Sequence, residues 1–230
     1  MKIVVFSGAG ISADSGIKTF RDSGGLWENY RIEDVATPEA FAENPQLVLD
    51  FYNMRVRDLK SAEPNAAHTS IARLQEKYDV EVITQNVDDL HERAGSEKVL
   101  HLHGELTKCR SIADEKVLYP MPEAGLKLGD CCESGHQLRP HIVWFGEMVP
   151  AIDAALKTVR SSDALIIVGT SLQVYPAAGL AFEAPEGAEV YLVDPGDIPN
   201  YMREKVTHIK EKAAAALPPI VKNLLRKAGG

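Results

Sequence analysis

The sequence has few cysteines, no long apolar run and no excess of positive charge. Its 230 residues include three cysteines, Cys109, Cys131 and Cys132. An odd, clustered set is not typical of a disulfide framework, which indicates a reducing compartment such as the cytoplasm. No stretch approaches the roughly 20 apolar residues of a membrane helix. The short apolar run at residues 3–6 is followed at once by polar and glycine residues, unlike a secretory signal. We therefore expect a cytoplasmic protein with no membrane partner.

The charge balance argues against another class of partner. The formal net charge is −8 and the sequence pI is about 5.4. Nucleic-acid-binding domains usually present a basic face, so we expect no nucleic-acid partner. The sequence contains no indication of the oligomeric state.

Short β-branched runs alternate with helical patterns along most of the chain. The runs are nearly continuous, as in strands buried on both faces of a parallel sheet. They lie at residues 2–6, 80–84, 99–103, 164–169, 189–194 and 206–209. Helical spacing of apolar residues occurs at 44–59, 65–78, 152–160, 172–182 and 213–227. This order predicts an α/β fold with a doubly wound, Rossmann-like parallel sheet.

Two segments interrupt the alternation. Residues 105–142 are rich in glycine, proline, cysteine and charge and lack a clear period, which predicts a small inserted module. Residues 14–60 contain a polar loop and then helical patterns, which predicts a loop over a ligand and the helical part of a small lobe. We therefore expect residues 1–104 and 143–230 to form one nucleotide-binding domain.

A glycine loop follows the first predicted strand. Residues 8–13 read Gly-Ala-Gly-Ile-Ser-Ala, which matches the pattern G-x-G-x-x-G/A between a strand and a helix. Such glycines let the backbone approach a pyrophosphate, and the next helix N-terminus offers free N–H groups. A dehydrogenase would carry an acidic ribose-binding residue about 20 positions on. A loop-like segment with the aromatic residues Phe20 and Trp27 stands there instead, so hydride transfer is not expected.

Polar residues and one glycine lie at or just after the ends of four of the predicted strands, where ligands bind in a doubly wound sheet. They are Gln85, Asn86, Asp88, His103, Gly169, Thr170, Ser171 and Asp194. Single members are also good helix caps, but their joint placement favours a binding site. His103 is the best candidate for proton transfer, because the ordinary pKa of histidine lies near neutrality. A histidine bonded to the backbone is the alternative, and His101 is a competitor.

Several motifs occur in order along nearly the whole chain. They are GAGIS at 8–12, TFR at 19–21, TQNVD at 84–88, HLHG at 101–104, LRP at 138–140, VWFGE at 143–147 and VGTS at 168–171. In this combination the chain resembles the sirtuins, which are NAD-dependent protein-lysine deacylases.

The resemblance implies roles for the matching residues. His103 and Asn86 would be catalytic, with His103 as base on a ribose hydroxyl. The acyl oxygen of lysine would attack C1′, nicotinamide would leave, and O-acyl-ADP-ribose would form. An acylated peptide would add to a strand at 143–147, where Val143, Phe145 and Gly146 would bind it. NAD, the co-substrate, would be held by Gly8, Ala9, Gly10, Ala13, Phe20, Arg21, Trp27, Gln85, Asn86, Asp88, Gly169, Thr170, Ser171, Asp194 and Ala213.

Tyr52 and Arg55 indicate which acyl group is preferred. They lie three positions apart and so share one face of the predicted helix 44–59. A phenol beside a guanidinium suits a carboxylate. The pattern Tyr-x-x-Arg is similar to that of the sirtuin subgroup that removes succinyl, malonyl and glutaryl groups. The alternative is a surface arginine paired with Asp50 or Asp58. We expect acidic acyl groups to be favoured, with deacetylation as a second activity.

The zinc motif of the family is broken. Sirtuins usually carry two C-x-x-C pairs in the insert. Here Ile112 stands where the partner of Cys109 would be, and Ser134 where that of Cys131 would be. Cys132 and His136 are other donors, but they do not restore the spacing, so we expect no zinc. We expect the insert to have its own small core, made of Ile112, Leu118, Tyr119, Met121, Leu126 and Leu128.

Two alternatives use the same site. One is an NAD-dependent ADP-ribosyltransferase that modifies protein, which the sequence does not exclude. The other is a non-catalytic NAD-sensing module, for which the lost zinc cysteines are the only indication. The presence of Asn86, Asp88 and His103 together argues against the second.

Overall fold

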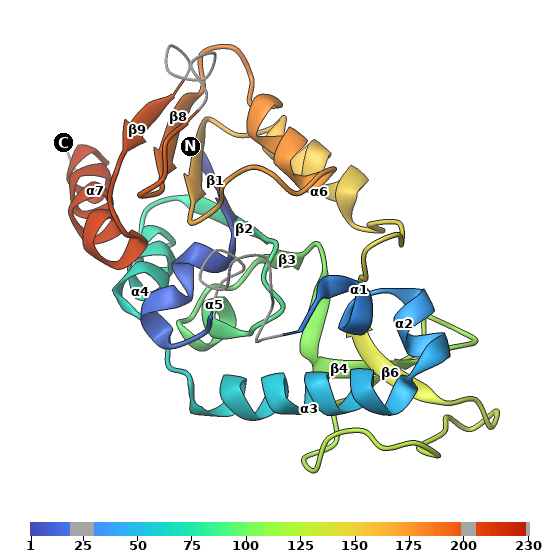
Figure 1. The fold of residues 1–230 in the computed structure, drawn as a ribbon. Helices are drawn as coiled ribbons and strands as arrows, with labels where there is room; N and C mark the ends of the chain where they lie inside the picture. Colours follow the sequence, from blue (N-terminus) through green and yellow to red (C-terminus); the bar gives the residue numbers. More distant parts are fainter. Residues whose placement is uncertain (19–29, 199–205, 229–230) are drawn as a thin grey trace.

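A six-stranded sheet forms the centre of the larger lobe (Figure 1). The computed structural model describes residues 1–18, 30–198 and 206–228. The strand order is β3-β2-β1-β7-β8-β9, and every neighbouring pair is parallel. The bounds are β1 Lys2–Ser7, β2 Asp79–Thr84, β3 Val99–His101, β7 Ala164–Val168, β8 Glu189–Val193 and β9 Thr207–Ile209. The predicted parallel sheet is confirmed.

Helices cover both faces of this sheet. Because successive side chains of a strand point to opposite faces, Ile3 and Val5 of β1 pack in one core cluster and Val4 and Phe6 in another. The first cluster includes side chains of α4 (Ala66–Leu74) and α7 (Ala213–Lys227). The second includes side chains of α6 (Ile152–Val159) and the 3-10 helix η4 (Ala177–Phe182). The sheet is therefore doubly wound, as predicted.

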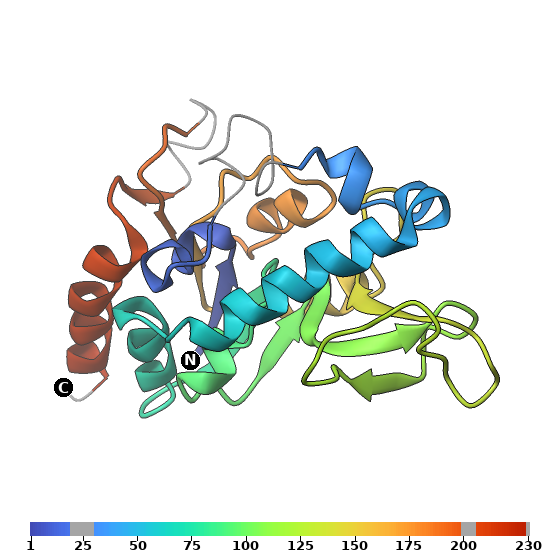
Figure 2. The same cartoon turned by 60° about the horizontal axis from the view of Figure 1, so that its bottom comes forward.

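A smaller lobe lies beside the sheet. Its strands β4 (Gly104–Ser111), β5 (Leu118–Pro120) and β6 (Leu138–Ile142) pair antiparallel in the order β5-β4-β6. Its helices are α1 (Ile32–Val35), α2 (Pro38–Glu43) and α3 (Pro45–Ser61), and the short α5 (Leu90–Arg93) follows β2. Figure 2 shows α3 running from beside α4 along β4. Phe51 and Tyr52 of α3 share a core with Leu106 of β4 and Ile142 of β6, so α3 packs against the sheet of the small lobe.

Several predicted elements are shorter than expected. The strand predicted at 99–103 ends at His101, and the helix predicted at 65–78 ends at Leu74. The helix predicted at 172–182 is only the 3-10 helix η4. Leu172 has a φ of +54°, and proline at 176 disfavours helical backbone in the residue before it. This segment therefore starts as a loop.

The predicted core of the insert is partly wrong. Ile112, Leu118 and Leu128 are exposed, with 53%, 41% and 50% of their surface accessible. Leu126 is buried as predicted, and the predicted Tyr119 and Met121 are half-buried beside it. The other members of this cluster were not predicted: Cys109, Leu138 and Leu49 of α3 are buried, and Cys132 is half-buried. Three short strands enclose too little apolar surface to be stable alone. The insert therefore buries one side against α3 and leaves the other side exposed.

None of the helices in the described residues has both the length and the apolar character needed to span a bilayer.

Candidate active site

A cavity of about 1010 Å³ lies where the carboxyl ends of the parallel strands face the small lobe. Its size suits a large ligand, since small-molecule sites usually measure about 300–1,000 Å³. Most residues predicted for the site line this one cavity: Gly8, Ala9, Gly10, Ala13, Tyr52, Arg55, Gln85, Asn86, Asp88, His103, Val143, Phe145, Gly146, Gly169, Thr170, Ser171, Asp194 and Ala213. Phe20, Arg21 and Trp27 lie outside the described residues.

The glycine loop packs directly on the loop after β7. The Gly10 N–H donates to the Gly169 carbonyl at 2.8 Å, and the Gly8 N–H donates to Val168 at 3.0 Å. A Cβ at Gly10 would lie 2.8 Å from Gly169 Cα, and a Cβ at Gly8 would lie 2.8 Å from the Gly169 oxygen. Only glycine permits this approach, which leaves both loops with bare backbone at the cavity.

One expectation for this loop is wrong. The sequence predicted a helix N-terminus after the glycines, but two single 3-10 turns follow, Ala9–Ile11 and Ala13–Ser15. Gly16, with a φ of +88°, ends the second turn. The left-handed backbone of a glycine commonly stops a helix, so no long helix dipole points into the cavity here.

A buried hydrogen-bond chain connects Asn86 and Asp88 through Ser12. Asn86 Nδ2 donates to Ser12 Oγ at 3.0 Å, and Ser12 Oγ donates to Asp88 Oδ2 at 3.0 Å. Asp88 Oδ1 accepts from the Leu90 N–H at 3.2 Å. Burial raises the pKa of the Asp88 carboxyl. Ser12 was not predicted as a site residue. The sequence feature that could have indicated it is a hydroxyl inside the glycine loop; in the structure this side chain makes no capping hydrogen bond.

His103 enters the cavity with a defined orientation. Its Nδ1 lies 3.0 Å from the carbonyl oxygen of Gln85. A carbonyl only accepts hydrogen bonds, so Nδ1 carries the proton and Nε2 is the basic atom of the neutral ring. Burial lowers the pKa of His103, partly offset by this hydrogen bond. The ring is therefore neutral near pH 7 and able to accept a proton at Nε2.

His101 is bound on both ring nitrogens. Its Nδ1 lies 3.0 Å from the Asn86 carbonyl oxygen, and its Nε2 lies 2.8 Å from Glu92 Oε1. The cavity lining includes His103 but not His101. Between the two candidates, His103 is the one placed to act on a ligand.

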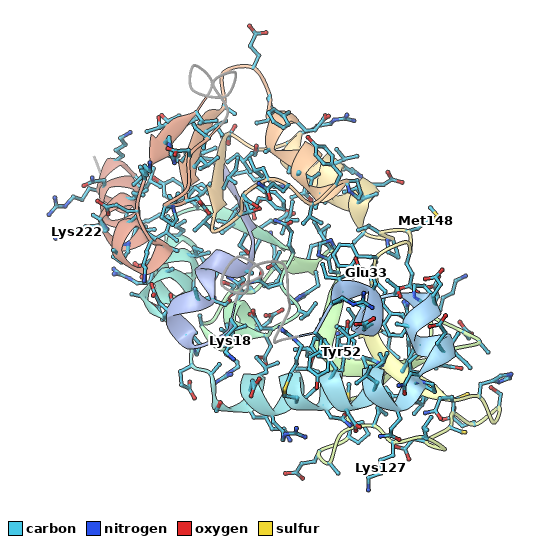
Figure 3. The ribbon with its side chains drawn as sticks, viewed as in Figure 1. Lys18, Glu33, Tyr52, Lys127, Met148 and Lys222 are labelled. Carbon is cyan, nitrogen blue, oxygen red and sulfur yellow. The ribbon has the colours of Figure 1, made fainter. Side chains whose placement is uncertain are left out.

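Tyr52 and Arg55 lie three positions apart on α3 and line the same cavity. Figure 3 labels Tyr52, which lies within the small lobe. Tyr52 is 1% exposed and Arg55 is 8% exposed. The guanidinium carbon of Arg55 lies 6.0 Å from the Phe51 ring centroid. The alternative hypothesis was a surface arginine paired with Asp50 or Asp58. Arg55 is buried, so it is not a surface arginine.

The strand expected at 143–147 does not form. Strand β6 ends at Ile142, and a turn with Gly146 at φ +90° follows, closed by the Glu147 N–H donating to the Trp144 carbonyl at 3.0 Å. The Glu147 carboxylate also accepts from the Trp144 N–H at 2.8 Å. This local hydrogen bonding competes with strand geometry. Val143, Phe145 and Gly146 nevertheless line the cavity.

The remaining cysteines do not assemble a metal site within the described residues. No group of three histidine, cysteine or acidic side chains there is placed to hold an ion. Cys109 Sγ donates to the Pro120 carbonyl oxygen, and Cys131 is exposed. Cys132 Sγ lies 3.1 Å from Ser134 Oγ, which lies 3.2 Å from His136 Nδ1.

The cavity fits NAD in chemical terms. Backbone approach at Gly8 and Gly169 suits phosphates, while Asn86, Asp88 and Thr170 offer amide, carboxylate and hydroxyl groups to riboses and an amide. Asp194 is buried, and its Oδ1 accepts from the Gly196 N–H at 2.8 Å. An ordered carboxylate at the end of β8 suits ribose hydroxyls.

The chain is similar in sequence and in fold to known proteins. The model of the Sir2 family matches residues 8–176. The chain is 50% identical over 226 residues to the NAD-dependent protein deacylase of Helicobacter pylori (strain ATCC 700392 / 26695), with 98% of each chain covered. Among solved structures, a Sir2 homologue in complex with NAD is 37% identical with a TM-score of 0.88, covering 99% of this chain and 90% of that one. A mutant Sir2 homologue in complex with 2′-O-acetyl ADP ribose has the same identity and TM-score, and the comparison covers 99% and 93%. The chain therefore belongs to the Sir2 family, as its ordered motifs predicted.

Proposed function

We propose that this Sir2-family protein is an NAD-dependent protein-lysine deacylase that favours acidic acyl groups, succinyl and malonyl, over acetyl. The observation that carries the acyl preference is the burial of Tyr52 and Arg55 in the cavity that also holds His103. The guanidinium of Arg55 lines the cavity and can offer a bidentate pair of N–H donors to a carboxylate. A succinyl or malonyl chain ends in a carboxylate that accepts from it, whereas acetyl has none.

The chain's own residues account for the remaining chemistry. Bound NAD supplies the ribose carbon that the acyl oxygen attacks as nicotinamide leaves. Nε2 of His103 accepts a proton from a ribose hydroxyl, because Nδ1 is committed to the Gln85 carbonyl. Asn86 and Asp88, fixed by Ser12, orient the nicotinamide and ribose end. One water is taken up as the acyl–nitrogen bond breaks, and free lysine, nicotinamide and O-acyl-ADP-ribose are the products.

The test is a panel of acyl-lysine peptides incubated with NAD and followed by mass spectrometry. We expect kcat/KM for succinyl- and malonyl-lysine to exceed that for acetyl-lysine. Arg55→Met keeps the length and apolar stem but removes the charge, so the succinyl preference should fall by about tenfold or more. Arg57→Met is the matched control, since Arg57 is exposed on the same helix and should leave the preference unchanged.

Two outcomes would contradict the proposal. If Arg55→Met keeps the wild-type ratio of succinyl to acetyl turnover, the acidic preference does not depend on this pair. If label from NAD passes to protein and no acyl-ADP-ribose forms, the protein is an ADP-ribosyltransferase instead.

A further inference from the structure

The hydroxyl of Tyr52 has a hydrogen-bond partner that constrains where its proton points. Trp144 Nε1 lies 3.0 Å from Tyr52 Oη, and the two ring centroids are 6.3 Å apart. An indole N–H only donates. Tyr52 Oη is therefore the acceptor, and its own proton must point away from the indole.

The indole of Trp144 is held firmly. The guanidinium carbon of Arg139 lies 3.3 Å from the indole ring centroid. Arg139 is bound by Glu147 at 2.7 and 3.0 Å and donates to the Ile142 carbonyl at 2.8 Å. The Phe41 ring packs beside the indole at 5.3 Å between centroids. Because Glu147 also accepts from the Trp144 backbone N–H, both the ring and its attachment are fixed, and so is the direction of the indole N–H.

The phenol remains a donor at ordinary pH. Burial raises the pKa of Tyr52 far above its usual value, so the O–H stays protonated. Accepting a hydrogen bond from Trp144 also polarises the O–H and makes it a better donor. Tyr52 lines the cavity beside Arg55. The pair thus presents an oriented O–H and a guanidinium, and a carboxylate, which is an acceptor on both oxygens, satisfies both.

We infer that Trp144 is a specificity-determining residue that selects acidic acyl groups by orienting the Tyr52 hydroxyl as a donor into the acyl site. The inference rests on the proposed preference for succinyl and malonyl. Trp144 acts through Tyr52, so it is a positioning residue. Arg139 and Glu147 support it by holding the indole.

The experiment compares kcat/KM for succinyl- and acetyl-lysine peptides in wild type, Trp144→Phe, Tyr52→Phe and the double variant. Trp144→Phe keeps an aromatic ring but removes the N–H. We expect the succinyl-to-acetyl ratio to fall about three- to tenfold, from the loss of one oriented hydrogen bond to a charged group. In the Tyr52→Phe background the same change should lower the ratio no further, because the hydroxyl that Trp144 orients is gone.

A packing control separates orientation from structure. Phe41→Leu loosens the support of the indole without removing its N–H, so it should lower the melting temperature more than it changes the ratio. If Trp144→Phe does not fold, benzothienylalanine at position 144 replaces the N–H by sulfur at nearly constant shape and should give the same drop in ratio.

The outcomes are distinguishable. A folded Trp144→Phe protein with the wild-type ratio overturns the inference and leaves the proposed acyl preference standing. An equal drop in the Tyr52→Phe background also overturns it, because Trp144 would then act without the Tyr52 hydroxyl. A wild-type protein that does not prefer succinyl over acetyl removes the proposed preference and the inference with it.

Discussion

The Nδ1 atom of His103 donates to the carbonyl oxygen of Gln85 across 3.0 Å, so the end of β2 sets the tautomer of a histidine that follows β3. The strands are neighbours in register, with Thr84 opposite His101. Gln85 lies one residue beyond Thr84 and His103 two residues beyond His101, where both chains have left the sheet but still face each other. The same peptide segment that carries Gln85 also carries Asn86 and Asp88, so a single strand end positions the base and its neighbours.

Removing this imidazole should abolish turnover without unfolding the protein. His103→Ala is expected to lower kcat by about 10²–10⁴-fold, the usual contribution of a general base, with little change in melting temperature because the side chain is only half-buried. Peptide deacylation and thermal melts measure the two effects. Near-normal deacylation by His103→Ala would refute its role.

In wild type, the acidic limb of the pH profile of deacylation should lie below pH 6.5, because burial lowers the pKa of His103 and only the neutral ring accepts a proton.

The contact between the two glycine loops offers a test of NAD binding. In Gly10→Ala the new methyl group would lie 2.8 Å from Gly169 Cα, a distance that forces backbone to move. We expect NAD affinity to fall by more than about tenfold, as shifted loops lose approach to the phosphates. Isothermal titration with NAD measures this change. Gly179→Ala is the control, because a Cβ there has nothing within 4 Å. Equal NAD affinity in wild type and Gly10→Ala would mean that the loop contact does not shape the nucleotide site.

The sequence predicted most of the sheet and most of the cavity lining because both depend on local patterns. Buried parallel strands are continuous apolar runs, and their carboxyl ends carry the ligand-binding groups. The Trp144–Tyr52 hydrogen bond was not predictable, because it joins residues 92 positions apart and depends on how α3 crosses β6. The prediction of the insert core was partly wrong for a related reason. Apolar residues alone do not indicate which side of a small sheet faces α3. The strand predicted at 143–147 does not form because the Glu147 carboxylate accepts from the Trp144 N–H and stabilises a turn there.

The broken cysteine pattern leads to a direct prediction about metal. Ile112 and Ser134 replace two of the expected thiolates, and neither is a good zinc ligand. We expect purified protein to contain well under about 0.1 zinc per chain by mass spectrometry, and chelators to leave its melting temperature unchanged. The double variant Ile112→Cys, Ser134→Cys restores both C-x-x-C pairs, so its zinc content is the comparison for wild type. Stoichiometric zinc in wild type, or a melting temperature lowered by chelator, would contradict the prediction.

Two buried histidines, His68 and His91, should make the protein sensitive to acid. His68 and His91 pack edge to face with ring centroids 5.0 Å apart, and His91 Nε2 lies 2.9 Å from Ser7 Oγ. Burial lowers the pKa of His68 to about 4 and that of His91 to about 3, the latter with a contribution from His68. The unfolded chain, with histidine near 6.5, binds more protons than the folded chain below that pH, so stability falls as the pH decreases. At pH 5 each histidine should cost about 2 kcal/mol.

Thermal or urea unfolding between pH 7.5 and 5 measures this loss. In the double variant His68→Asn, His91→Gln the amides replace Nδ1 and Nε2 at similar positions, so Asn65 and Ser7 keep a partner while the titration disappears. We expect the variant to be somewhat less stable at pH 7.5 but to lose far less stability at pH 5. His136→Asn is the control, since His136 is exposed and should leave the slope as in wild type. If wild type and the double variant lose stability in parallel, the acid sensitivity arises elsewhere and the buried pair does not determine it.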